Sequence, residues 1–139
     1  MFSIVIPTWN NLAHLQLVLR SIREHSREAH QIIVHVNDGR DGTREWVRAQ
    51  GIAHTASDDN IGICYAMNEA AMLARHEHLV YMNDDMYCLP GWDTALQRRV
   101  PARQAVHVVV HVDEVLVPRQ HRRLVHRVAD ADVVVGGGV

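Results

Sequence analysis

Lysine is absent from this chain of 139 residues, cysteine occurs twice, and aromatic residues make up only 5% of the sequence. All fourteen basic residues are therefore arginine, and against sixteen acidic residues they leave a formal charge of −2. Without a basic excess to neutralise a phosphate backbone, we expect no nucleic-acid partner. Cys64 and Cys88 lack CxxC or zinc-ligand spacing, which argues against a disulfide framework and favours thiols in or near the core.

Long apolar segments are also missing. No run reaches the ~18 apolar residues that a membrane-spanning helix needs. The N-terminal segment MFSIVIPTWN has no basic start and is interrupted by Pro7, so it is typical of a strand and not of a signal peptide. We therefore expect a cytoplasmic protein whose length allows one domain or a fragment of a larger one.

Short β-branched segments alternate with segments of helical periodicity over residues 1–97. The predicted strands are Ser3–Ile6, Gln31–Val36, Ile52–Thr55 and Leu79–Met82, and the predicted helices are Leu12–Ile22, Thr43–Gly51 and Ile61–Arg75, with Thr43 as a helix N-cap. This alternation predicts an α/β fold whose mostly parallel, open sheet is flanked by helices.

Polar clusters follow three of the predicted strands. They are Pro7–Asn10, Asn37–Asp38 and Asn83–Asp85. In open parallel sheets ligands bind beyond the carboxyl ends of the strands, so we expect the three clusters to line one cleft. Asp38 could accept hydrogen bonds from a base or a ribose, and adjacent carboxylates suit a hard divalent cation. Turn formation explains the same residues structurally, and both interpretations stay open.

Phosphate-binding signatures are weak. The segment Asn60–Gly62 precedes a predicted helix and could present its amides to an anion. Neither GxGxxG nor GxxxxGK[ST] occurs, which counts against a dinucleotide-binding or P-loop enzyme.

The composition changes after Arg98. Residues 98–139 consist almost wholly of Val, Arg, His, Ala and Asp, so we divide the chain into a domain over residues 1–97 and an atypical tail over residues 98–139. The tail segments AVHVVVHV, VLV and VVV favour strands, and exposed strands of this kind promote a homo-oligomer. We hypothesise that the tail comes from a frameshift or an aberrant C-terminus.

Four segments together resemble a known family. SIVIPTWN, HVNDGRDGT, DDNIGICYAMNEA and HLVYMNDDMYCLPGWD, in this order, resemble the family-2 glycosyltransferases of the GT-A fold over about residues 2–97. The resemblance implies a Rossmann-like nucleotide-diphospho-sugar transferase fold in truncated form, because nothing in the chain matches the family's acceptor-binding half. It implies an enzyme that moves a sugar from a nucleotide-diphosphate donor to an acceptor hydroxyl, with inversion.

The resemblance also assigns residues. The nucleotide-binding residues it implies are Pro7, Thr8, Asn10, Asp38, Asn60, Gly62, Asn68 and Asp84. Asp85 would hold a divalent metal, Mn²⁺ or Mg²⁺, that bridges the diphosphate, whereas Asn83 departs from the family's usual Asp. The catalytic base is unknown, because the acidic residues of the tail, Asp113, Glu114, Asp130 and Asp132, lack the family's context. Trp46 and Trp92 favour a packing role, with Trp92 expected to border the donor site.

Other interpretations stay open. The acceptor is a glycan, a lipid-linked molecule or a protein, and a lipid-borne acceptor would place the protein at the inner face of the membrane. A nucleotide-binding fragment without transferase activity is the first alternative. A nucleotidyltransferase is the second, although SIVIPTWN lacks the basic, Gly-rich phosphate loop of that class.

Overall fold

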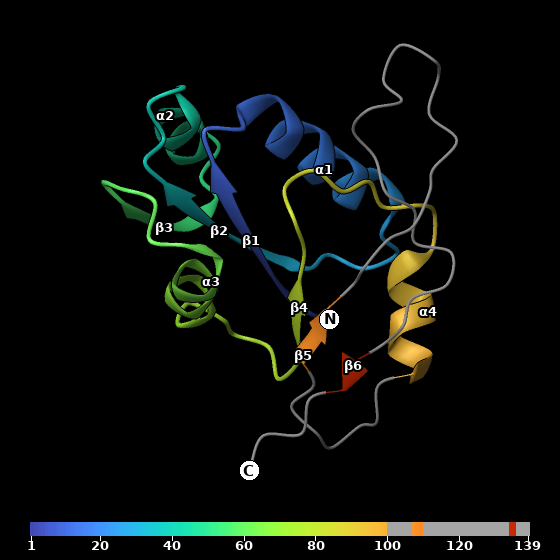
Figure 1. Cartoon of the computed structure of the whole chain (residues 1–139). Helices are drawn as coiled ribbons and strands as arrows, with labels where there is room; N and C mark the ends of the chain where they lie inside the picture. Colours follow the sequence, from blue (N-terminus) through green and yellow to red (C-terminus); the bar gives the residue numbers. More distant parts are fainter. Residues whose placement is uncertain (100–106, 110–133, 136–139) are drawn as a thin grey trace.

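The computed structural model describes residues 1–99, 107–109 and 134–135 (Figure 1). Its elements are β1 (Ser3–Trp9), α1 (Leu12–His25), β2 (Gln31–Asn37), α2 (Thr43–Ala49), β3 (Ala53–Ser57), α3 (Ile63–Ala71), β4 (Leu79–Tyr81), α4 (Trp92–Arg99), β5 (His107–Val109) and β6 (Val134–Val135). The strands form one sheet in the order β3-β2-β1-β4-β5-β6, in which only the β5–β6 pair is antiparallel. The predicted α/β class with a mostly parallel, helix-flanked sheet is confirmed.

The register of β1, β2 and β4 determines which residues lie together at the carboxyl edge of the sheet. β1 pairs with β2 along its whole length, from Ser3 opposite Gln31 to Trp9 opposite Asn37. β4 pairs only with the first residues of β1, from Ser3 opposite Leu79 to Val5 opposite Tyr81. The chain after β4 then runs beside the second half of β1.

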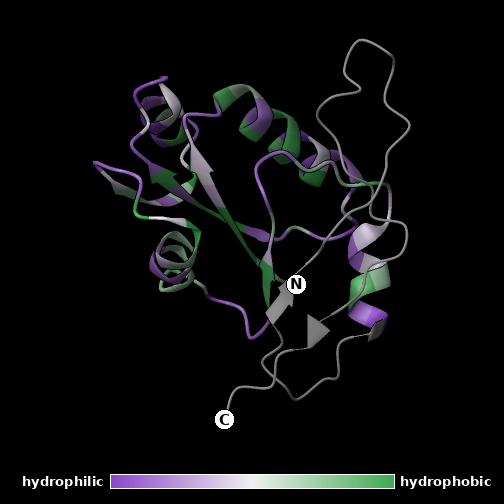
Figure 2. Cartoon of the chain, in the orientation of Figure 1, coloured by the Kyte–Doolittle hydropathy of each residue, from purple (hydrophilic) through white to green (hydrophobic). Residues whose placement is uncertain are grey.

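The two faces of the sheet are covered unequally. Ile4 and Ile6 of β1 belong to the larger core cluster, which also takes buried residues from α1, α2 and α4. Val5 points to the other face, where a smaller cluster contains Ile33 of β2 and Ala70 of α3. The interior strands are coloured hydrophobic, and α1 carries both hydrophobic and hydrophilic residues (Figure 2). Successive side chains of β1 point to opposite faces of the sheet, so this strand contributes residues to both core clusters.

Strand β1 is longer than predicted. It continues through Pro7 to Trp9, although proline cannot donate a ladder hydrogen bond. The register explains this, because β4 ends opposite Val5 and leaves Pro7 with a strand partner on one side only.

Two helix predictions were wrong in detail. Gly42, with a φ of 89°, is the N-cap of α2, and Thr43 is its first residue. Asp41 takes over the capping, since its carboxylate accepts hydrogen bonds from the Thr43 N–H at 3.1 Å and the Leu12 N–H at 2.9 Å. Helix α3 is shorter than predicted, and its first residue, the apolar Ile63, is 53% exposed.

Other departures concern the thiols and α4. Cys88 is buried, which raises the pKa of its thiol to about 12, but Cys64 is exposed at the start of α3, so the expectation of two core thiols was half wrong. Helix α4 was not predicted, and its buried Trp92 and Leu96 join the larger core. Among the described residues, no helix has the length and apolar character needed to cross a bilayer.

The described parts of the tail extend the sheet. β5 lies within the predicted strand segment AVHVVVHV, and β6 lies within VVV. The VLV segment and the four acidic tail residues considered as bases lie outside the described residues. The division at residue 97 and the oligomer stay predictions.

Candidate functional site

A cleft of about 340 Å³ opens at the carboxyl edge of the sheet. Its lining comes from the ends of β1, β2 and β4 and from the start of α3: Pro7, Thr8, Trp9, Asn11, Asn37, Asn60, Gly62, Ile63, Asn83 and Asp84. Five predicted nucleotide-binding residues are among them, namely Pro7, Thr8, Asn60, Gly62 and Asp84. The structure thus brings part of each predicted polar cluster to one cleft: Pro7–Trp9 of the first, Asn37 of the second, and Asn83 and Asp84 of the third. Asn10, Asp38 and Asp85 of these clusters are not among the lining residues.

A hydrogen bond between Thr8 and Asp84 joins the end of β1 to the turn after β4. The Thr8 hydroxyl donates to Oδ2 of Asp84 at 2.6 Å, as the strand register allows. Burial raises the pKa of Asp84 and the neighbouring Asp85 carboxylate adds to the rise, while the Thr8 hydroxyl counteracts it. Burial thus disfavours the charged form of Asp84, and hydrogen bonds from Thr8 and Asn11 oppose this effect.

The last residue of β4 holds the side chain of Asn83. The Tyr81 hydroxyl donates to Oδ1 of Asn83. The pKa of Tyr81 is raised to about 12, first by burial and then by the carboxylates of Asp84 and Asp85, so this hydroxyl stays protonated and able to donate. The side chain that departs from the family's usual Asp is thus fixed by a neutral hydrogen bond.

Asn10 and Asp38 form a second pair beside the cleft. Both have left-handed backbones, with φ of 48° and 63°. The Asn10 amide donates to Oδ2 of Asp38 at 3.0 Å, and the Arg40 guanidinium donates from Nε to Oδ1 at 2.6 Å. The hydrogen bond from Arg40, followed by that from Asn10, lowers the pKa of Asp38. Asp38 is an ionised acceptor at neutral pH.

Backbone N–H groups in the loop before α3 donate hydrogen bonds to asparagine side chains. Asn37 Oδ1 accepts the Ile61 N–H at 3.0 Å, and Asn60 Oδ1 accepts the Gly62 N–H at 2.9 Å. The N–H groups of Ile61 and Gly62 are therefore engaged within the protein, and these two amides do not match the expectation that the segment presents its amides to an anion. A role of Asn60 and Gly62 in nucleotide binding stays a prediction. Asn37 and Asn60 instead fix the wall of the cleft.

Asn68 and Asp85 do not line the cleft. Asn68 is exposed on the second turn of α3. Asp85 is half-buried next to Asp84, close enough for its charge to raise that residue's pKa. Conversely, Trp9 lines the cleft with a 58% exposed side chain, although the motif assigned no role to it. The signal available was an aromatic residue at the end of a buried segment rich in β-branched residues.

The carboxylate oxygens of Asp84 and Asp85 suit a hard divalent cation that keeps some of its water ligands. In the described part of the chain, no three His, Cys, Asp or Glu side chains gather at one point. Asp84 and Asp85 therefore supply at most two carboxylate ligands, with oxygens that Mn²⁺ and Mg²⁺ accept. Mg²⁺ is typically held by one or two carboxylates plus substrate phosphates. The residues present fit such an ion only if a phosphorylated ligand completes the site.

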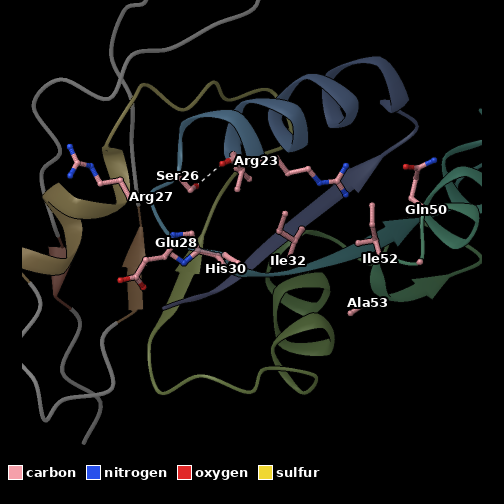
Figure 3. A pocket seen from close by; sticks show the side chains of 12 residues that line it. Arg23, Ser26, Arg27, Glu28, His30, Ile32, Gln50, Ile52 and Ala53 are labelled. Atoms are coloured by element: carbon pink, nitrogen blue, oxygen red, sulfur yellow. Dashed lines mark hydrogen bonds between the residues drawn. The ribbon is translucent and has the colours of Figure 1, made fainter.

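A larger cavity of about 480 Å³ lies at the opposite, amino edge of the sheet (Figure 3). Ile32 and Ile52 contribute apolar surface to its lining, and Arg23 lies above them. Ser26 and His30, which also line it, contact Trp92, whose indole donates to the Ser26 hydroxyl at 3.0 Å. Trp92 is thus a core residue of the amino edge, and the expectation that it borders the donor site was wrong.

Comparison with known proteins gave one family and several structures. The model of the family described as "Glycosyl transferase family 2" matches residues 3–135. No curated protein matches the sequence. Residues 1–349 of S. aureus TarS share 16% identity with a TM-score of 0.61, and the match covers 84% of this chain and 42% of TarS 1–349.

Two of the matching structures contain ligands. The mannosyltransferase PcManGT from Pyrobaculum calidifontis, in complex with GDP-Man and Mn²⁺, has 24% identity and a TM-score of 0.59 over 88% of this chain and 37% of its own. TarS 1–349 in complex with UDP has 19% identity and a TM-score of 0.56 over 69% of this chain and 31% of its own. This chain spans less than half the length of these structures, with which it shares the fold.

Proposed function

The chain belongs to glycosyl transferase family 2, and from this membership and the geometry of the cleft we propose that it binds a nucleotide-diphosphate sugar at the carboxyl edge of its sheet. The bound sugar is then transferred to an acceptor hydroxyl by a single, inverting displacement. The observation that carries the proposal is the apposition of Thr8 and Asp84, which places the turn bearing two adjacent carboxylates against the end of β1.

The nucleoside lies toward the end of β2. Asp38, ionised at neutral pH, accepts hydrogen bonds from the base or the ribose. The exposed indole of Trp9 offers a flat apolar face at the rim of the cleft. Asn10 keeps the Asp38 carboxylate oriented, because its amide already donates to Oδ2. These groups bind and orient, and they take no proton from the substrate.

The diphosphate lies toward Asp84 and Asp85. Two carboxylates and a diphosphate repel one another, so a divalent cation, Mn²⁺ or Mg²⁺, is needed among them. When bound, the ion offsets the negative charge that develops on the departing nucleoside diphosphate. Asp85 and Asp84 would hold it, and Thr8 fixes the position of Asp84. The carboxylate oxygens of Asp84 and Asp85 support a metal at this position, and so does the Mn²⁺ complex of PcManGT.

Metal-dependent binding tests the proposal. Isothermal titration of UDP and GDP with and without Mn²⁺ should show tighter binding of at least one nucleotide with the metal. Asp85→Asn removes one ligand charge and keeps a side chain that suits a turn, so it should weaken metal-supported binding by roughly tenfold or more with little change in thermal stability. Glu77→Gln, an exposed residue before β4, removes the same charge away from the cleft and should bind like the wild type. Binding of both nucleotides by Asp85→Asn with unchanged affinity and unchanged Mn²⁺ dependence would refute the metal site.

A nucleotide-binding protein without transferase activity is the alternative. Among the described residues, Asp84 is the only carboxylate that lines the cleft, and it is engaged by Thr8. A transferase needs a base for the acceptor hydroxyl, which here would have to come from outside this lining. Assays of donor hydrolysis and of transfer to a lipid, glycan or peptide hydroxyl separate the two. Nucleotide binding without turnover in any of these assays favours the alternative.

A further inference from the structure

Helix α1 is preceded by an asparagine whose side chain does not cap it. Asn11 is the N-cap residue, and asparagine at this position ordinarily accepts an N–H of the first turn. Within the described part of the chain, the Asn11 side chain makes no such hydrogen bond. Asp41 supplies an acceptor instead, since its Oδ2 receives the Leu12 N–H at 2.9 Å. The Asn11 side chain is therefore available for other contacts.

One of these contacts is with the turn after β4. Asn11 lines the cleft and is hydrogen-bonded to the carboxylate of Asp84, which also accepts the Thr8 hydroxyl at 2.6 Å. A carboxylate can only accept, so Asn11 presents its Nδ2 amide group to Asp84. Asp84 is thus held from two sides, by the end of β1 and by the residue immediately before α1.

His14 holds the other end of the Asn11 amide. Its Nδ1 lies within hydrogen-bond distance of Asn11 Oδ1. An amide oxygen can only accept, so Nδ1 of His14 carries a proton and donates it. With Oδ1 bound to His14 and Nδ2 bound to Asp84, the Asn11 amide cannot rotate without losing both hydrogen bonds.

The imidazole of His14 comes at a cost to stability. Its Nε2 is buried and has no hydrogen-bond partner among the described residues. A buried polar atom without a partner destabilises a fold, whereas a leucine such as the neighbouring, buried Leu15 has no polar atom to leave unpaired. Packing alone therefore does not explain a histidine at this place, and the contact with Asn11 does.

We propose that Asn11, oriented by His14, is a positioning residue that fixes the turn bearing Asp84 and Asp85 for a metal ion and a diphosphate. The inference rests on the proposed function, since it concerns the diphosphate end of that same site. Loss of a residue that orients a metal ligand typically lowers metal affinity by about 10–100-fold. Asn11 and His14 act through the two carboxylates and take no part in the chemical step.

The test compares nucleotide binding with and without Mn²⁺ in matched variants. UDP and GDP are titrated into the wild type, Asn11→Ala, His14→Leu, His14→Asn and His54→Leu. His54 of β3 is the control for loss of a histidine, because its Nδ1 also lies near a carbonyl oxygen, that of Ile52 at 2.8 Å, and it is not among the residues that line the cleft.

The single variants separate positioning from a structural role. Asn11→Ala and His14→Leu should lose about tenfold in affinity with Mn²⁺ and less than about twofold without it. His14→Asn can place an amide donor near the position of Nδ1 and should retain most of the affinity, and His54→Leu should bind like the wild type. His14→Leu should keep or raise the melting temperature, because it removes the unpaired Nε2.

The double variant Asn11→Ala/His14→Leu tests whether His14 acts through Asn11. It should bind no more weakly than Asn11→Ala, because neighbours in one hydrogen-bond network are not additive. Multiplied losses, wild-type affinity of His14→Leu, or equal losses with and without Mn²⁺ would overturn the inference and leave the proposed function intact. A lower melting temperature of His14→Leu with no rescue by His14→Asn would also overturn it. Absence of Mn²⁺-supported binding of either nucleotide by the wild type would instead refute the proposed function, and this inference with it.

Discussion

Protonation of the buried His30 should lower the free energy of unfolding below about pH 6.5. Its side chain is 0% exposed at the amino end of β2, where Nδ1 accepts the Phe2 N–H at 3.1 Å and Nε2 faces Oδ2 of Asp93 at 3.2 Å. Burial lowers the pKa of His30 although Asp93 opposes the effect. The neutral ring fits both contacts, because a protonated Nδ1 could no longer accept the Phe2 N–H.

The sign and size of the effect follow from linkage. A folded pKa below the unfolded value of about 6.5 means that the stabilisation is complete above that pH and is lost as the pH falls through the folded pKa. One histidine changes the free energy of unfolding by at most about 1.4 kcal/mol per pH unit. Burial lowers the pKa of His35 as well, so the two residues together can double this slope.

Urea unfolding at pH 8, 7, 6 and 5 measures the slope. The wild type should lose stability from pH 7 to pH 5, and His30→Gln should be less stable at pH 8 but flatter in its pH dependence. His35→Gln should flatten the profile independently, because His35 bonds to Thr55 and Ser57 and not to the His30 cluster. A wild-type slope retained by His30→Gln would refute the neutral, buried state of His30.

Further predictions concern the loops and the cleft. Asp41→Ala removes the acceptor for the first N–H groups of α1 and α2 and should lower the free energy of unfolding in urea by about 1–2 kcal/mol, and an unchanged midpoint would contradict this capping role. Gly39→Ala should cost about 1–3 kcal/mol in thermal unfolding, because its φ is 79° and a Cβ would lie 2.8 Å from Cγ1 of Val36. Gly51→Ala, at a φ of 64° with no atom within 4 Å, should cost less, and equal losses would exclude the clash as the cause. Trp9→Ala should weaken UDP or GDP binding by about tenfold at unchanged melting temperature, and unaltered affinity would exclude the indole from the nucleoside site.

The sequence alone determined the alternation of strands and helices and the edge at which the polar clusters leave the sheet. β-branched runs such as Gln31–Val36 favour buried parallel strands, and the chain direction then sends the residues after each strand to one edge. This local information is sufficient to place Asp38 and Asp84 at the same edge. The four family-like segments added the expectation of a nucleotide at that edge.

Boundaries and exposure needed the fold. Pro7 stays in β1 because β4 stops opposite Val5, and no feature of the segment SIVIPTWN encodes where a strand far along the chain ends. Ile63 and Cys64 occur among apolar neighbours typical of a buried helix face. They are exposed because the small residues Ala66 and Ala70 carry the packing of α3.

Contacts between distant residues were decided only by the tertiary structure. Thr8 meets Asp84 across 76 residues because two strands of fixed register lie side by side. His30 meets Asp93 across 63 residues, and Trp92 packs at the amino edge, because α4 folds back onto the end of α1 and the start of β2. Local propensity depends on neighbours in sequence, whereas these pairs are set by long-range packing and strand register. The assembled sheet and its helices therefore decide whether a given carboxylate is hydrogen-bonded, buried or exposed.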